Sequence, residues 1–218
     1  MNKKFGEIKI TVSSIFTVIA FCFIIEVQAQ KVEKLFNGKN LSGWNFVIDK
    51  NVEPANEVFT VADSVICVKG TLGYMYTKKK YGNTVVHVEW RWADEPTNSG
   101  IFILIEDPKN PFPKGIECQL AAGQAGDLVL LGGSDLQNYK APPEGRPAFP
   151  KILKENPSSE KTAGEWNHAN IFIKDGVIDV YVNGIHQNHG TTAVKSGHIG
   201  LQSEGKKIQF KNITVTPL

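Results

Sequence analysis

Apolar and polar residues alternate along most of the chain beyond residue 57, and short polar turns interrupt the alternation. In segment 85–92 every even-numbered residue is apolar, while the odd-numbered residues include His87, Glu89 and Arg91. Successive side chains of a strand point to opposite faces of a sheet. The pattern therefore predicts a half-buried strand with these three polar residues on one face.

Two dipeptides mark tight turns between further strands. Asp175-Gly176 divides segment 170–187 into two strands, and Asn183-Gly184 ends the second of them. Both dipeptides suit the type I′ hairpin turn, because its two central residues need positive φ. Another pair of strands is predicted over 198–218, with a turn near Gly205. The same criteria predict strands at 57–62, 64–69, 101–106, 115–120 and 127–131.

Many short strands without a sustained helical period are typical of an all-β protein. We therefore predict an antiparallel two-sheet sandwich, a jelly roll, formed by a single domain at residues 30–218. Segment 132–164 is the exception, because it is rich in Pro, Gly, Ser, Lys and Glu and has little periodicity. Long loops in compact domains are often functional, so we expect this segment to form a lip over a binding cleft.

The first residues differ in kind from the rest of the chain. Three lysines within the first nine residues precede an almost wholly apolar run, Ile10 to Ile25, which Val27-Gln28-Ala29 follows. This pattern predicts a signal peptide at residues 1–29, cleaved after Ala29, and a periplasmic or secreted protein. A transmembrane anchor is the weaker alternative, because the apolar run is short and ends at Glu26. We expect no stable membrane span after cleavage.

Composition and cysteine content narrow the classes of partner. The chain is 41% hydrophobic and 21% charged, and its net charge of +2 gives no electrostatic reason to expect a nucleic-acid partner. Two cysteines, Cys67 and Cys118, lie beyond the predicted cleavage point, each among alternating apolar residues. Buried free thiols are the expected state, and a single disulfide in an oxidising compartment is the alternative.

Several familiar catalytic motifs are absent from the sequence, namely GxSxG, HExxH, the P-loop and paired CxxC. Of the five histidines, only His186 and His189 are close in sequence. They follow a predicted hairpin turn, so we expect an exposed polar pair there rather than a metal site. The acid that follows Glu117 is Asp127, beyond a Gly-rich turn, so the two-carboxylate arrangement of an ordinary glycosidase is not evident.

The strand at 115–120 carries an unusual polar pair. Glu117 and Gln119 alternate with three apolar residues, so they share one face of the strand. Glutamate is a poor strand former and is rarely buried without a partner. Asn98 and the pair Trp166-Asn167 lie at the starts of other predicted strands. From the pattern alone, these polar residues either line a groove on a curved sheet or form solvated outer faces.

Seven short motifs occur in an order that resembles one known family, the 3-keto-disaccharide hydrolases. The motifs are LFNGKNLSGW (35–44), VEWRW (88–92), NSGIF (98–102), GIECQL (115–120), GEWN (164–167), VYVNG (180–184) and GHIGLQSEGKKIQFKNITV (197–215). The resemblance spans almost all of the predicted mature chain. It implies a concanavalin A-like jelly roll, an origin among Bacteroidetes, and cleavage of glycosides whose sugar is oxidised to a ketone at C3.

The resemblance also implies site residues. The residues that match family motifs are Arg91, Asn98, Glu117, Gln119, Trp166, Asn167 and Gln202. Two departures stand out. Many family members carry an arginine shortly after Asn-Ser-Gly, where this chain is apolar through Ile105. Many also have Asp-His-Gly after the last glutamine, where this chain has Ser203-Glu204-Gly205.

A ketone at C3 acidifies the hydrogen on C2, so a base can remove it and the enolate can expel the group on C1. This route needs a base near C2, donors near the C3 oxygen and an acid for the leaving group. We expect Glu117 to serve as the general acid/base, with His87 as the alternative base. The residues expected to bind substrate are Glu89, Arg91, Asn98, Gln119, Trp166, Asn167 and Gln202.

The expected partner is an oligosaccharide or another glycoside. We expect no cofactor and assign no metal ligands, although a polar groove could also accept a divalent cation such as calcium. Two other functions fit the same pattern. One is a non-catalytic carbohydrate-binding module, and the other is a purely structural domain of the cell envelope, because fold alone does not determine function.

Overall fold

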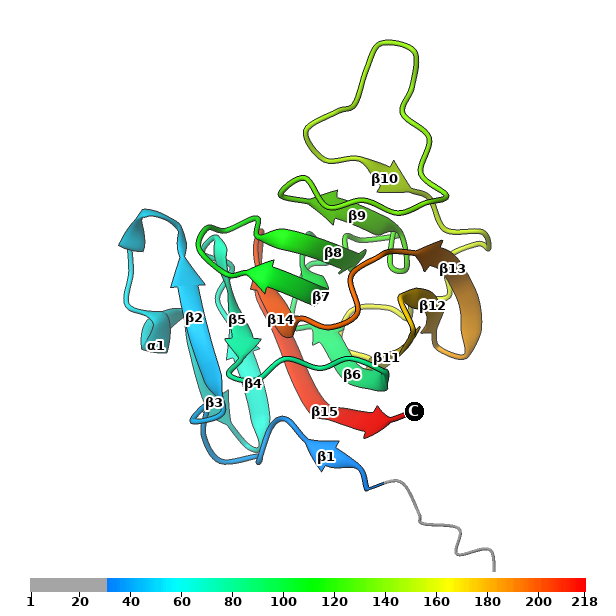
Figure 1. Ribbon diagram of the computed structural model, residues 1–218. Coiled ribbons are helices and arrows are strands. Elements are labelled where there is room, and N and C mark those ends of the chain that lie inside the picture. Colours follow the sequence, from blue (N-terminus) through cyan, green and yellow to red (C-terminus); the bar gives the residue numbers. More distant parts are fainter. Residues whose placement is uncertain (1–30) are drawn as a thin grey trace, which may run out of the picture.

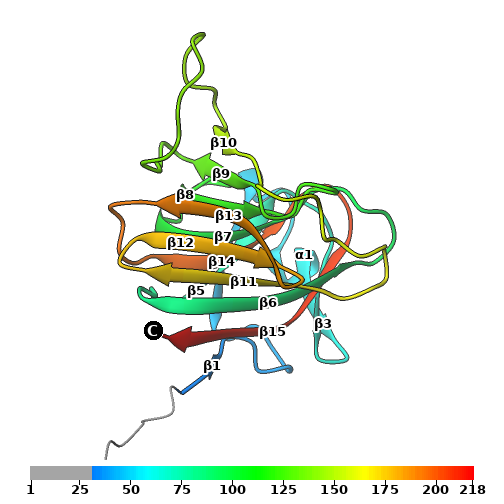
Figure 2. The same cartoon turned by 90° about the vertical axis from the view of Figure 1, so that its right-hand side faces the viewer.

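A computed structural model describes residues 31–218 of the chain, so the predicted signal peptide lies outside the described residues. Two antiparallel sheets form a sandwich, which confirms the predicted fold class (Figure 1). Short helical turns at Asp49–Asn51 and α1 (Ala55–Val58) are the helical elements of this part of the chain. The strands run side by side in each sheet, and the C-terminus follows the last strand (Figure 2).

We call the two sheets A and B. Sheet A has the strand order β13-β12-β11-β6-β15-β4-β3, and β1 pairs with β15. Its strands are β1 (Glu33–Lys34), β3 (Phe59–Ala62), β4 (Val65–Val68), β6 (Thr84–Trp92), β11 (Asn167–Lys174), β12 (Val177–Val182), β13 (Ile185–Thr191) and β15 (Ile208–Pro217). Sheet B has the order β10-β9-β8-β7-β14-β5-β2. Its strands are β2 (Trp44–Ile48), β5 (Gly73–Thr77), β7 (Gly100–Asp107), β8 (Lys114–Gln119), β9 (Leu128–Leu131), β10 (Lys151–Ile152) and β14 (His198–Ser203).

Most of the predicted strands are present within two or three residues of their expected bounds. The two hairpin turns are also confirmed, because both residues of Asp175-Gly176 and of Asn183-Gly184 have positive φ. The pattern missed β2 and β5, which lie before the clearest alternation. The predicted strand at 57–62 begins instead with the last turn of α1.

The main core lies between the sheets, where the even-numbered residues of β6 are fully buried, as the alternation predicted. Ile116 and Cys118 of β8 face this same core. Sheet B also carries a smaller apolar cluster on its opposite face, which we call the outer cluster. Its buried members are Tyr74, Phe102, Ile105, Val129 and Leu131. Fully buried apolar side chains therefore lie on this outer face, whereas the outward-facing residues of β6 in sheet A are half-buried.

The two cysteines among residues 31–218, Cys67 and Cys118, form no disulfide. Cys118 is buried on β8 in sheet B, whereas Cys67 is half-buried on β4 in sheet A. The expected state of free thiols is confirmed, although Cys67 is less buried than predicted.

The 132–164 segment forms two structures rather than one lip. Residues 132–150 rise as a loop beyond β9 and β10 (Figure 1). Residues 152–160, which we call the strap, run beside β13 and the turn at 121–127. The amide of Glu155 donates to the carbonyl of Gln187 at 2.7 Å, and Glu160 accepts from the amide of Ala125 at 2.9 Å.

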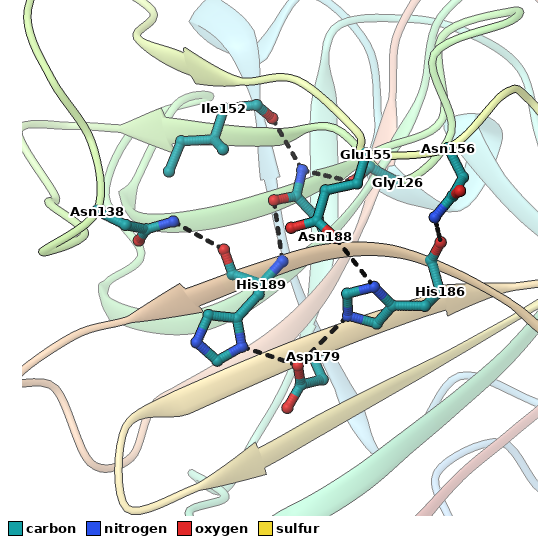
Figure 3. Close-up of polar contacts among 9 residues, drawn as sticks. All are labelled: Gly126, Asn138, Ile152, Glu155, Asn156, Asp179, His186, Asn188 and His189. Atoms are coloured by element: carbon teal, nitrogen blue, oxygen red, sulfur yellow. Dashed lines mark hydrogen bonds and ion pairs between the residues drawn. The ribbon is translucent and has the colours of Figure 1, made fainter.

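A β-bulge in β13 fixes the strap. The register with β12 shifts between Val180 and Tyr181, so that Gln187 has no direct partner there. The next residue, Asn188, is 1% exposed, and its side-chain amide donates to the carbonyls of Gly126 at 3.1 Å and Ile152 at 2.9 Å (Figure 3). One buried side chain therefore joins sheet A to the turn after β8 and to the start of the strap.

We predict that Asn188→Ala lowers the free energy of unfolding by about 2–3 kcal/mol, because it leaves two buried carbonyls without their donor. The matched control is Asn138→Ala, since Asn138 is exposed and donates one bond, to the carbonyl of His189 at 2.9 Å. Its effect should stay within about 0.5 kcal/mol. Urea denaturation of both variants measures the difference. Equal losses in the two variants would contradict the role given to Asn188.

Candidate functional site

A cavity of about 200 Å³ lies on the outer face of sheet B. It brings together four of the residues that the sequence predicted, from strands that are far apart in the chain. They are Asn98, Glu117, Gln119 and Gln202. The remaining lining residues are Phe112, Val129, Leu131, Phe149, Lys151 and Glu204. The cavity is smaller than the pockets that take drug-sized ligands, about 300–1,000 Å³, so its size suits a single sugar ring.

Glu117 is the chemically unusual residue of this cavity. Its side chain is 3% exposed, beside the outer cluster, and among residues 31–218 its Oε1 atom has no hydrogen-bond partner. Burial raises the pKa of this carboxyl to about 8, and the negative charge of Glu204 adds to the rise, while Lys151 opposes it. At neutral pH the group is therefore mainly protonated and can act as an acid.

The structure explains why serine and glycine follow Asn98 in the Asn-Ser-Gly motif at residues 98–100. A Cβ atom on Gly100 would lie 2.3 Å from Oε1 of Glu117, so only glycine leaves room for the carboxyl to lie across β7. The hydroxyl of Ser99 donates to the carbonyl of Gln202 at 2.9 Å and so joins the start of β7 to β14. The motif thus shapes the cavity and aligns two of its walls.

The amides in the cavity have defined orientations. Oε1 of Gln119 accepts from the backbone amides of Leu120 and Ala121, both at 2.9 Å, so its NH₂ group is the end free to serve a ligand. Nε2 of Gln202 donates to Glu204 at 2.7 Å. Its Oε1, like Oδ1 of Asn98, has no partner within the described part of the chain. Buried acceptors without donors suit a ligand that is rich in hydroxyl groups.

Besides Val129 and Leu131, which lie on the strand predicted at 127–131, four lining residues were not predicted as part of a site: Phe112, Phe149, Lys151 and Glu204. In the sequence, Glu204 differs from the family pattern but is not predicted to contact substrate. The other three lie in turn or loop sequence, where no periodicity indicates which way a side chain points. The 132–164 segment does reach the cavity, as expected of a lip, through Phe149 and Lys151.

The structure places His87, Glu89 and Arg91 away from this cavity, on the outer face of sheet A. The two outer faces lie on opposite sides of the sandwich, which corrects the expectation of one shared groove. His87 contacts Oδ1 of Asn170 at 2.8 Å and cannot serve as the base for a substrate beside Glu117. Glu89 accepts from Nδ2 of Asn212 at 2.8 Å.

Trp166 and Asn167 also lie at sheet A, where Asn167 is the first residue of β11 and Trp166 directly precedes it. The Trp166 ring is flanked by Arg91, 4.7 Å from its centroid, and by Lys211 at 4.0 Å. Asn167 is buried, and its Oδ1 accepts from the amide of Lys161 and from Nδ2 of Asn183, both at 2.8 Å. It therefore positions the end of the 132–164 segment, so these two residues do not line the cavity with Glu117.

His186 and His189 both contact Asp179, and His186 also contacts Glu155 of the strap (Figure 3). The distances are 3.4 Å and 2.8 Å to Asp179 and 3.3 Å to Glu155. Over residues 31–218, no group of three or more His, Cys, Asp or Glu side chains could hold a metal ion. The contacts instead join the strap to β13, beside the bonds of Asn188.

A larger cavity, about 540 Å³, lies over sheet A near Cys67 and Gln209. None of its lining residues, all within the described region, has a buried side-chain polar atom that lacks a partner. The smaller cavity around Glu117 is therefore the better candidate for chemistry.

The antiparallel two-sheet sandwich places the chain in a fold class that includes concanavalin A-like glucanases. The chain belongs to the family of the 3-keto-alpha-glucoside-1,2-lyase-like domain, whose model matches residues 31–216. The match confirms the family resemblance of the sequence motifs and supports a carbohydrate-active function. A search of curated proteins found no match.

Similar solved structures agree on the fold. A proposed glycosyl hydrolase of Parabacteroides distasonis has a TM-score of 0.62 and 23% identity over 86% of this chain and 100% of its own. A second structure from that organism has a TM-score of 0.61 and 22% identity, over 86% and 94% of the two chains. A β-glucanase of Bacillus licheniformis is 13% identical, with a TM-score of 0.56 over 88% and 100%. At these identities the likeness concerns the fold alone.

No helix among residues 31–218 has the length and apolar character needed to cross a membrane.

The raised pKa of Glu117 predicts a pH-dependent cost to stability. Between about pH 4.5 and pH 8, the folded protein holds a proton that the unfolded chain releases, so wild-type stability falls as pH rises through this window. Glu117→Gln does not titrate. We expect its melting temperature to match wild type near pH 4.5 and to exceed it by at least about 2 °C at pH 8.

Thermal unfolding followed by circular dichroism across this pH range measures the difference. Glu144→Gln is the matched control, because Glu144 is exposed on the 132–150 loop, and its difference from wild type should not change with pH. If the difference in melting temperature between Glu117→Gln and wild type stayed constant with pH, Glu117 would not carry a raised pKa.

Proposed function

We propose that the protein cleaves the glycosidic bond of 3-keto-glycosides by β-elimination. The observation that carries the proposal is the buried carboxyl of Glu117, whose pKa is raised to about 8, in a cavity that also holds a second carboxyl, Glu204. The family description is consistent with such a substrate. Two acidic groups held in different surroundings can perform different proton transfers on one substrate.

Glu117 and Gln119 suit the stabilisation of the C3 oxygen. A protonated carboxyl in an apolar site can donate to a ketone and strengthen that bond as negative charge develops. The free NH₂ group of Gln119, two residues along the same strand, supplies a second donor. The unpartnered oxygens of Asn98 and Gln202 accept hydrogen bonds from ring hydroxyls. In this arrangement the ketone lies toward the buried end of the cavity.

Glu204 is the group that we assign as base. It takes the proton from C2, the C2–H electron pair forms the C1=C2 double bond through the enolate, and the C1–O bond breaks. Lys151, the cationic residue of the cavity, gives a proton to the departing oxygen. The products are an enone and an alcohol, and a water molecule can then add to the enone. Glu204 stands where many family members carry histidine, so a titratable group is retained there.

The first test compares a 3-keto-glucoside with the corresponding plain glucoside. We expect turnover of the keto sugar alone, because only the ketone acidifies C2–H. Glu117→Ala should lower kcat/KM by about 10²–10³-fold, the cost of removing one oxyanion donor. Glu117→Gln keeps a neutral donor and should lose less. Chromatography of the released alcohol measures turnover, and parallel reactions with EDTA and with added calcium test whether a cation contributes.

A folded wild-type protein that is inert toward both sugars would refute the enzyme proposal. Binding of intact glycans without turnover would support a carbohydrate-binding module instead, and neither binding nor turnover would favour a structural role. The predicted export of the protein would place the reaction in the periplasm or outside the cell.

The pH profile provides a second test. If Glu117 must hold its proton, kcat/KM should fall above about pH 8. We call this fall the alkaline limb of the pH profile. Lys151 lowers the pKa of Glu117, so Lys151→Met should move the alkaline limb to higher pH and should also lower kcat/KM. In Glu117→Gln the limb should disappear. An alkaline limb that stays in place in both variants would assign it to another group.

A further inference from the structure

Two aromatic side chains edge the cavity, and the proposed chemistry at C2 and C3 does not use them. Phe112 lies in the connection between β7 and β8, and Phe149 lies just before β10. Their ring centroids are 4.9 Å apart, with the planes at 65°. We call them the aromatic pair. They come from segments far apart in the chain and meet only at this cavity.

Phe149 is 46% exposed, although it lines the cavity. Glu117, at 3% exposed, is the buried end of the same space. The cavity thus runs from a closed, polar end at Glu117 to an open end at Phe149. A large apolar ring left half in water loses the free energy that burial would supply, and a ligand that covers it would recover that free energy.

The position of Phe149 is defined by backbone bonds on the residues that follow it. The carbonyl of Pro150 accepts from the amide of Leu130 at 2.9 Å, and the carbonyl of Ile152 accepts from Asn188 at 2.9 Å. Phe149 therefore stands at the end of an anchored strand rather than at the tip of the 132–150 loop. A ring on an anchored backbone loses little conformational entropy when a ligand stacks on it.

We propose that the aromatic pair binds the leaving group of the substrate and so determines which glycosides the protein cleaves. This inference rests on the proposed function. The cavity has room for one sugar ring, and its ketone lies toward Glu117. C1 is separated from C3 by C2, and its bond to the leaving group points away from the ketone. We place the leaving group at the open end of the cavity, where it meets Phe149.

The chemistry of the aromatic pair favours leaving groups with a flat apolar face. An aryl ring is such a group, and so is the C–H face of a pyranose, because both stack on aromatic side chains. A methyl group is too small to cover Phe149. The structure therefore predicts a preference for aryl 3-keto-glucosides and 3-keto-disaccharides over the methyl 3-keto-glucoside.

The test measures kcat/KM of wild type and Phe149→Ala on three substrates: an aryl 3-keto-glucoside, a 3-keto-disaccharide and the methyl 3-keto-glucoside. We expect Phe149→Ala to lose about tenfold on the first two substrates and less than twofold on the third. A larger loss on the aryl substrate than on the disaccharide would identify aryl groups as the preferred occupant, and the reverse would identify the sugar face. Phe149→Trp should restore the preference.

Phe172→Ala is the matched control, because Phe172 is an exposed ring on β11 in sheet A, on the other side of the sandwich. Its three kcat/KM values should keep their wild-type ratios. Turnover of all three substrates with ratios unchanged by Phe149→Ala would overturn the leaving-group site and leave the proposed function standing. Wild-type inertness toward all three would overturn both.

Discussion

The burial of one carboxyl on the outer face of sheet B is the constraint on which the rest of the site depends. Glu117 can lie there only because Gly100, its diagonal neighbour on β7, has no side chain. The apolar outer cluster then excludes water from the carboxyl and keeps it protonated. A solvated glutamate on the same strand would be ionised at neutral pH and could not donate to a ketone.

This constraint also explains why sheet B, and not sheet A, carries the candidate site. Both sheets have polar side chains on their outer faces, but those of sheet A are largely paired. His87, Glu89 and Arg91 contact Asn170, Asn212 and Gln209. Around Glu117, three buried oxygens within the described chain have no partner. An unpaired buried polar atom costs stability unless a ligand satisfies it, so such atoms mark the face that binds.

The contacts between the sheets hold the open end of the cavity. Asn188, on a bulge at the edge of sheet A, binds the residue that follows Lys151, and His186 contacts the strap through Glu155. A strand pattern does not reveal such a bulge, because the extra residue breaks the alternation at only one position. The same limit applies to Phe112 and Phe149, whose loops have no period from which a direction can be read.

Local alternation and turn chemistry determined most strands, the two-sheet class and the polar pair Glu117 and Gln119. These features depend on residues that are close in the sequence, because side chains alternate between two faces in any strand, whatever its place in the sheet. Only the tertiary structure decided which polar faces meet. It separated His87 and Arg91 from Glu117 and joined Glu204, Lys151 and Phe149 to it. Sheet order and the path of the 132–164 segment produce this grouping, and both arise from contacts between residues that are distant in the sequence.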